Sequence, residues 1–282
     1  MGGAARWREG GRRRLKHEVV SVVRITHIGG PTTLIEVGGW RLLTDPTFDA
    51  PGRTYHFGWG SASRKVAGPA IAATDVGPID AVLLTHDHHA DNLDDAGRAL
   101  LPTARVVVTT VAGAGRLGVN ARGLAPWGTT RLDGADRPSI EITATPCRHG
   151  PPGSHFIVGD VIGFALRWEG QQNGEFWISG DTVLFDGVRK VAERVHVCTA
   201  MLHLGGVRFP ITGPVRYTLT AAHAVELCAL LKPRTIIPIH YEGWSHFQEP
   251  KAVVETAFEH APDGVRRSLH WIPLGGAVEI PA

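Results

Sequence analysis

Cysteine, net charge and long apolar runs are all scarce in this sequence. The three cysteines, Cys147, Cys198 and Cys228, are scattered and form no Cys-x-x-Cys pair, which argues against both a disulfide framework and a thiolate zinc site. The formal net charge is only +2, which is too small for an extended nucleic-acid-binding surface. We therefore expect a cytoplasmic protein that has no nucleic-acid partner.

Segments that would direct the chain into or across a membrane are also missing. No apolar run approaches the ~20 residues that a membrane-spanning helix needs, so we expect no membrane insertion. Residues 19–23 are too few, and too polar at their edges, for the hydrophobic region of a secretory signal. We also find no internal repeat and no low-complexity tract.

The composition supports a folded domain with a substantial core. The chain has 282 residues, of which 43% are hydrophobic and 20% charged, and this suits one layered α/β domain. Residues 1–20 include the basic run Arg12, Arg13 and Arg14, which we expect to lie in a disordered leader; the alternative is an arm for an acidic partner. We expect residues 21–282 to form a single domain.

The segment 82–95, VLLTHDHHADNLDD, joins a short apolar run to a cluster of histidines and carboxylates. Residues 81–84 are apolar without alternation, as in a strand covered on both faces, and the turn after such a strand can present ligands. Imidazole nitrogens and carboxylate oxygens are ligands of zinc, manganese and iron. The alternative is a solvated turn in which Asp91 caps a helix that begins near Asn92. The density of candidate ligands favours a metal site: His86, His88, His89 and Asp91.

This segment resembles the H-x-H-x-D-H signature of the metallo-β-lactamase-fold hydrolases, although it does not match letter for letter. In one register, His86 and His88 are the first two histidines, and Asp91 stands where the family has another histidine. In the other register, residues 89–94 align with H-x-D-H-L-D, and one extra residue separates the first two histidines. Asn92 then replaces a histidine ligand of the second metal site. We favour the second register, because it keeps the aspartate and the Leu-Asp pair that opens the next helix.

A second resemblance narrows the family. Residues 43–48, LTDPTF, resemble the loop after the early strands in the branch that contains the ascorbate-6-phosphate lactonases and the N-acyl phosphatidylethanolamine phospholipases D. The resemblance covers residues 25–244. It implies an α/β fold of the four-layer αββα type, with a metal centre at one edge of the sheets.

Three later segments supply the other ligands that the resemblance implies. His149 follows a predicted strand, in the place of the third ligand of the first metal site. Asp181 follows an apolar strand and Gly180, and such a carboxylate can bridge two cations; the alternative is a helix cap ahead of Val183. His240 ends another apolar strand and matches the last ligand of the family. A candidate ligand thus follows an apolar strand at each of these positions.

The implied chemistry is hydrolysis by water that a metal activates. A divalent metal lowers the pKa of bound water from ~15.7 toward ~7, so hydroxide becomes available to attack a small-molecule ester, lactone or phosphodiester. Asp91 would orient this nucleophile, hold a second metal with Asp181 and His240, and protonate the leaving group. We expect zinc or manganese, one or two per chain, and leave iron open. The first metal would be held by His86, His89 (or His88), His149 and Asp181.

Two other classes of function remain as alternatives. One is an iron-dependent oxidoreductase or dioxygenase on the same fold, which Asn92 supports because it weakens the second site. The other is a non-catalytic protein that binds the metal as a structural or sensory element. The sequence does not decide the substrate, and it leaves a homo-oligomer open.

The remaining pattern predicts an alternation of strands and helices. The β-branched segment 22–43, with its Gly-Gly turns, predicts an antiparallel meander. The segment 48–78, rich in glycine, proline and aromatics, predicts a lid or binding loop, in which His56 either faces the substrate or is an ordinary loop residue. His203 either contacts a substrate oxyanion or is structural. We predict helices at 93–101, 111–117, 218–231 and 250–260, and strands at 105–109, 139–145, 161–168 and 175–179.

Overall fold

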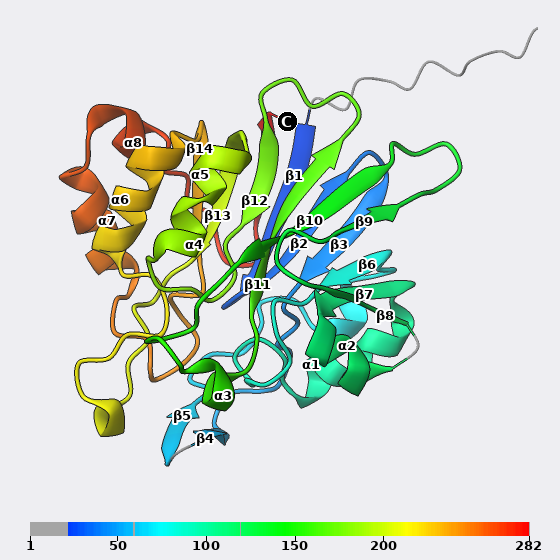
Figure 1. Ribbon diagram of the computed structural model, residues 1–282. Helices are drawn as coiled ribbons and strands as arrows, with labels where there is room; N and C mark the ends of the chain where they lie inside the picture. The colour runs from blue at the N-terminus through cyan, green and yellow to red at the C-terminus, as the bar shows by residue number, and fades with distance from the viewer. Residues whose placement is uncertain (1–21, 59, 119, 282) are drawn as a thin grey trace, which may run out of the picture.

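Two β-sheets packed face to face form the centre of the fold, and helices cover their outer faces (Figure 1). The structure is a computed structural model that describes residues 22–58, 60–118 and 120–281. The leader expected at residues 1–20 therefore lies outside the described residues. The four-layer αββα arrangement that the sequence predicted is confirmed.

The first sheet combines an antiparallel half with a parallel half. Its strand order is β15-β1-β2-β3-β6-β7-β8, and the pairs from β15 to β3 are antiparallel whereas those from β3 to β8 are parallel. The predicted meander is therefore confirmed. Strand β6 is buried throughout, as its unbroken apolar run indicated. The strands are β1 (Val22–Gly29), β2 (Thr32–Val37), β3 (Trp40–Thr44), β6 (Ala81–Leu83), β7 (Val106–Thr110), β8 (Ala121–Leu124) and β15 (Ala277–Pro281).

The second sheet follows the same plan, in the order β14-β13-β12-β11-β10-β9. Pairs from β9 to β12 are antiparallel, and β12, β13 and β14 are parallel. The strands predicted at 139–145, 161–168 and 175–179 agree with the structure to within one residue at each end. The strands are β9 (Thr129–Leu132), β10 (Ile140–Pro146), β11 (Ile162–Trp168), β12 (Glu175–Ile178), β13 (Val197–His203) and β14 (Thr235–Ile239).

Helices lie on both sides of the sandwich. Figure 1 shows α1 and α2 beside the first sheet, and α4 to α8 beside the second. Apolar clusters join the two sheets to each other and each sheet to its helices. No helix in the described parts of the chain has both the length and the apolar character for a bilayer span. The helices are α1 (Asp95–Leu100), α2 (Val111–Leu117), α4 (Asp186–Arg189), α5 (Val191–Arg194), α6 (Ala221–Leu231), α7 (Lys251–Glu259) and α8 (Asp263–Arg267), with 3-10 turns at Ala73–Asp75 and Leu101–Thr103.

The start of α1 corrects one expectation. The sequence predicted a helix from residue 93, with Asp91 as the alternative cap, but the cap is Asp94, whose carboxylate accepts a hydrogen bond from Gly97 N at 2.8 Å. Asp94 also accepts hydrogen bonds from Phe48 N and from the buried Lys65 ammonium. These contacts place the helix cap at Asp94, three residues beyond Asp91. The side chain of Asp91 is therefore not used as a cap.

Three segments project beyond the strand ends where the candidate ligands lie. One is the hairpin of β4 (Thr54–Gly58) and β5 (Ser61–Arg64), inside the stretch that the sequence predicted to be irregular. The second contains α3 (His155–Val158), which lies near β4 at the lower end of the view in Figure 1. The third contains a 3-10 turn (Pro210–Thr212). An aromatic cluster ties the hairpin to the third segment through Phe57 and Phe209.

Candidate metal centre

Four loops that follow strand ends bring the candidate ligands together. Strand β6 leads into the loop of residues 84–94, β10 leads to His149, β12 leads to Asp181 and β14 leads directly to His240. His240 adopts a φ of 58°, in the left-handed region that residues other than glycine rarely use, and its N–H donates to Gly30 O at 2.9 Å. The strand therefore ends abruptly and turns its histidine into the site.

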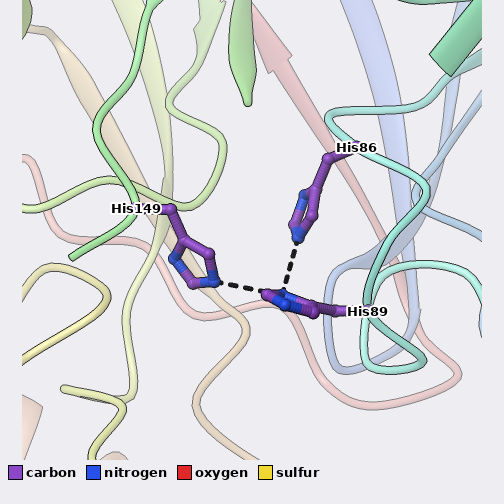
Figure 2. Close-up of side chains that lie close together, drawn as sticks. All are labelled: His86, His89 and His149. Atoms are coloured by element: carbon purple, nitrogen blue, oxygen red, sulfur yellow. Dashed lines mark hydrogen bonds between the residues drawn. The ribbon is translucent and has the colours of Figure 1, made fainter. Parts of the chain in front are cut away.

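Three histidines converge in what we term the histidine group, His86, His89 and His149. His89 Nδ1 lies 3.2 Å from His86 Nε2 and 3.1 Å from His149 Nε2 (Figure 2). All three rings are buried. At these distances, one nitrogen of each pair must carry no hydrogen. The lone pair of that nitrogen therefore points toward the middle of the group. The three nitrogens offer a ready set of imidazole ligands.

Hydrogen bonds on the far side of the rings orient the histidine group. His149 Nδ1 donates to Tyr217 O at 2.7 Å, which leaves Nε2 as the acceptor that faces the group. His86 Nδ1 lies 3.0 Å from Thr85 Oγ1, and the Thr85 hydroxyl in turn donates to the Asp45 carboxylate. An imidazole that binds a metal through one nitrogen donates a hydrogen bond from the other nitrogen, and both rings follow this pattern.

Burial keeps the histidine group neutral. It lowers the pKa of His89 to about 4 and that of His149 to about 3. The pKa of His86 also falls well below its usual value, first because of burial and then because of the neighbouring histidines. Neutral imidazole is the form that binds a metal, so near pH 7 these histidines need lose no proton.

A second set, which we term the carboxylate group, consists of Asp91, Asp181 and His240. His240 Nε2 lies 3.5 Å from Asp91 Oδ2, and His240 Nδ1 lies 3.6 Å from Asp181 Oδ1. Asp181 Oδ2 is also 4.0 Å from His149 Nε2. Through Asp181, the carboxylate group is therefore adjacent to the histidine group.

The carboxylate group contains buried polar atoms that have no hydrogen-bond partner. They are Asp91 Oδ1, both carboxylate oxygens of Asp181 and both ring nitrogens of His240. Leaving such atoms unsatisfied is costly, and nearly all buried polar groups in proteins are paired. A cation bound by one atom of each residue would satisfy three of them. Both groups therefore have the donors and the geometry to hold a metal ion.

Charge distinguishes the carboxylate group from the histidine group. Burial acts to lower the pKa of His240, but the nearby carboxylates of Asp181 and Asp91 outweigh it and raise this pKa to about 9. Burial raises the pKa of Asp181 to about 6. For Asp91, burial is outweighed by the contacts with His240 and His246, and its pKa lies well below the usual value. Near pH 7 this group therefore consists of a protonated His240 between carboxylates.

His246 supports Asp91, a role that the sequence did not assign to any one histidine. Its Nε2 lies 3.0 Å from Asp91 Oδ2, and its Nδ1 lies 2.5 Å from Ser63 Oγ. With the Ser63 hydroxyl donating to Nδ1, Nε2 carries the hydrogen and donates to Asp91. This fixes one oxygen of Asp91 and leaves Oδ1 facing the site.

Asp45 and His203 form a second supporting pair. Asp45 Oδ1 accepts a hydrogen bond from Thr85 N at 2.7 Å, and Asp45 Oδ2 lies 3.0 Å from His203 Nε2. Burial raises the pKa of Asp45 to about 7. His203 is fully buried, which favours the structural alternative over contact with a substrate. The LTDPTF segment contained the signal for Asp45, but sequence analysis assigned no role to this residue.

Three of the residues that the sequence singled out lie outside both groups. The His88 ring stacks over Gly159, where a Cβ would lie 2.2 Å from it, and His88 Nδ1 is 3.6 Å from Asp87 Oδ1. Asn92 Nδ2 donates to Thr85 Oγ1 at 3.4 Å. His56 is exposed on β4. In the described structure, the loop of residues 84–94 thus directs His86, His89 and Asp91 inward and His88 outward.

The fold and the two groups define the class of protein. A four-layer αββα sandwich, with histidines and aspartates gathered at the strand ends, is the metallo-β-lactamase architecture. Residues 40–241 match the model of the family described as "Beta-lactamase superfamily domain". The match covers well over half of the chain, and the chain belongs to this family.

Individual relatives agree with this assignment. A UPF0173 metal-dependent hydrolase of Methanosphaerula palustris is 29% identical over 208 residues, which cover 71% of this chain and 84% of that protein. The crystal structure of an isothiocyanate hydrolase from Delia radicum gut bacteria has a TM-score of 0.75 at 22% identity, and covers 92% of this chain and 99% of its own. A metallo hydrolase of Ignicoccus hospitalis has a TM-score of 0.66, also at 22% identity, with the same coverage. The two structures show a shared fold.

Proposed function

We propose that this chain is a metal-dependent hydrolase whose two adjacent groups each hold one divalent metal ion. The observation that carries the proposal is the buried carboxylate group, with its unpartnered oxygens and nitrogens, beside a histidine group whose nitrogens converge. The curated relatives named metal-dependent hydrolases support it. The substrate class follows from a further feature of the site, described below.

We assign the ligands by group. His86, His89 and His149 hold the first metal, and imidazoles of this kind suit zinc. Asp91 and His240 hold the second, where the carboxylate also suits manganese. The ligand that completes both sites is Asp181, through which the two groups are adjacent. His88 is not assigned as a ligand, because it lies outside both groups.

The residues of the chain then perform a hydrolysis as follows. Metal ions in such a centre supply Lewis-acid chemistry that makes water a usable nucleophile near neutral pH. Asp91 is ionised, and the hydrogen bond from His246 to its Oδ2 orients the carboxylate, which is placed to accept the proton of the attacking water. The same carboxylate returns this proton to the leaving group when the scissile bond breaks. The Tyr217 carbonyl and the Thr85 hydroxyl meanwhile keep their histidines in the correct orientation.

The test compares two neighbouring histidines, one inside the histidine group and one outside it. The wild-type chain, purified without chelator, should contain zinc or manganese and should hydrolyse p-nitrophenyl esters or bis(p-nitrophenyl) phosphate in a metal-dependent way. His89→Ala should lose one metal per chain and reduce kcat/KM by at least about 10²-fold. His88→Ala, the matched control, should retain both properties.

Three outcomes would overturn parts of this proposal. If His88→Ala lost the metal and His89→Ala kept it, the ligand assignment would be wrong. Iron accompanied by oxygen uptake, without hydrolysis, would favour an oxidoreductase on the same fold. A chain that holds no stoichiometric metal would favour a non-catalytic role.

A further inference from the structure

A cavity of about 360 Å³ opens directly onto the metal centre. It lies between the β4–β5 hairpin, the segment that contains α3 and the segment that contains Phe209. His89, Asp91 and His149 form its inner end, so it touches residues of both groups. A substrate whose scissile bond lies at the metal centre would therefore place a neighbouring substituent in this cavity.

Aromatic and aliphatic side chains form its walls. The ring of Phe57, on β4, lies 5.6 Å from the ring of Phe209 and 5.2 Å from that of His89, measured between centroids. The ring of Phe209 lies 5.8 Å from that of Tyr217. These contacts hold the walls in place before a ligand binds. The other apolar residues of the walls are Pro151, Pro152, Val158, Val207 and Val215.

Away from the metal centre, the described walls of the cavity offer no countercharge to an anionic substituent. Among the described residues that line it, there is no lysine or arginine, and the one carboxylate is that of Asp91. Proteins bind phosphate with arginine, lysine or free backbone donors, and an anionic substituent here would meet only apolar walls and a carboxylate.

Three of the four hydroxyl groups of the walls have little to offer an anion, the fourth being that of Tyr217. Each of the three donates its hydrogen to a backbone carbonyl of the same wall, so these hydrogens are already used. The bonds run from Ser61 Oγ to Gly58 O (2.6 Å), from Ser154 Oγ to His149 O (2.7 Å) and from Thr212 Oγ1 to Phe209 O (3.0 Å).

A neighbouring cavity of about 540 Å³ is the alternative place for an anion. Arg148 and His155 line it, but so does Asp160, which offsets the positive charge. Of the residues in the two groups, only His149 reaches it. The guanidinium of Arg148 also stacks on Phe185 at 4.8 Å. This second cavity therefore has a weaker claim to the substrate than the apolar one.

From the apolar walls, the absence of a cationic side chain among the described residues of those walls and the direct opening onto the metal centre, we infer that the substrate carries an uncharged, apolar substituent beside its scissile bond, as a carboxylic ester or lactone of an aliphatic acid does. This inference rests on the proposed hydrolase function. In the reaction, water adds its oxygen to the carbonyl carbon, the C–O bond to the alcohol breaks, and the alcohol leaves with a proton. No oxidant or further co-reactant is needed.

The first experiment measures hydrolysis of p-nitrophenyl acetate, butanoate and hexanoate by the metal-loaded full chain. Because each methylene buried in an apolar cavity contributes a factor of roughly four, kcat/KM should rise about fourfold per added methylene. Val215→Lys, which places a cation in the wall, should reduce this rise in kcat/KM to less than about twofold per added methylene. Arg148→Ala, the matched change in the neighbouring cavity, should leave the dependence unchanged.

The second experiment measures binding, so that it does not depend on turnover. Calorimetry on the metal-depleted chain, in which no metal ion attracts an anion, should show that the uncleavable neutral amide N-butylhexanamide binds at least about tenfold more tightly than N-butyladipamate, the same amide with a carboxylate at the end of its acyl chain, and that Val215→Lys reverses this order. A flat chain-length series, or tighter binding of the anionic amide, would overturn the inference. Tighter binding of the anionic amide that disappears in Arg148→Ala would do so by moving the substrate to the neighbouring cavity. If no ester or phosphodiester is hydrolysed, the proposed function fails, and the binding result alone decides the inference.

Discussion

The histidine group and the carboxylate group are adjacent, yet they satisfy their polar atoms in opposite ways. In the histidine group, ring nitrogens face one another at 3.1 to 3.2 Å, and the outer nitrogens of His86 and His149 are anchored by Thr85 and Tyr217. In the carboxylate group, buried atoms of all three residues lack a hydrogen-bond partner. The first group is therefore arranged by its own contacts, whereas the second has unpartnered atoms that the proposed second metal would bind.

The same difference sets the expected order of metal binding. The histidine group is already neutral near pH 7, so a metal displaces no proton there. In the carboxylate group, His240, whose pKa is about 9, must lose its proton before it can bind a metal. Asn92 directs its amide nitrogen toward Thr85 and leaves a buried Oδ1 without a hydrogen-bond partner, and an amide oxygen is a poorer zinc ligand than an imidazole. We therefore expect tight binding by the histidine group and weaker binding by the carboxylate group.

Removing one residue from each group should have the largest effect. The double variant His86→Ala with Asp181→Ala takes one ligand from the histidine group and the residue that completes both sites. We expect no stoichiometric metal, by elemental analysis, and a fall in turnover of at least about 10³-fold. A full metal load in this variant would refute the assignment of the centre.

Loosening Asp91 without removing a ligand should have a smaller effect. His246→Ala removes the hydrogen bond that fixes Asp91 Oδ2, and loss of such a supporting contact typically costs 10- to 100-fold in activity. We expect kcat to fall in this range while KM and the metal of the histidine group are retained. The matched control is His260→Ala, an exposed histidine at the end of α7, which should behave as wild type. An unchanged kcat in His246→Ala would show that Asp91 needs no partner.

Strengthening the carboxylate group should reduce the difference in zinc affinity between the two groups. Asn92→His restores the residue that the family signature has at this position, and imidazole is a better zinc ligand than an amide. We expect the second zinc to bind about tenfold more tightly, as measured by competition with a chelator. If its affinity does not change, the geometry of the loop, and not the identity of residue 92, limits the second site.

The protonation states of the histidine group should appear as a small effect on stability. The folded-state pKa of His149 is about 3 against an ordinary value of 6.5, so below pH 6.5 the unfolded chain binds a proton that the folded chain does not. Protonation of His149 therefore costs the folded chain no stability above pH 6.5, and the loss of stability grows as the pH falls below that value. Between pH 7 and pH 5, metal-depleted wild type should lose about 2 kcal/mol more than His149→Gln in urea unfolding. Equal losses would mean that His149 titrates normally.

Sequence reasoning reached the fold and the strand-end residues because both signals are local. An apolar run followed by a histidine or aspartate is visible within ten residues, as at His240. The role of His88 was ambiguous, because the sequence does not show which of two adjacent histidines on a turn points into the site. Only the path of the backbone decides it. The contacts of Asp91 with His246 and of Asp45 with His203 join residues 155 and 158 positions apart. No local pattern reports such pairs.

The central claim is that the two groups bind metal with unequal strength, and a titration of the metal-depleted wild-type chain with zinc at pH 7 tests it most directly. Calorimetry should show one tight step of a single zinc per chain, followed by a second step at least about tenfold weaker. His89→Ala should remove the tight step, and His240→Ala should remove the weak one. Two zinc ions of equal affinity, or a tight step that survives in His89→Ala, would contradict the account.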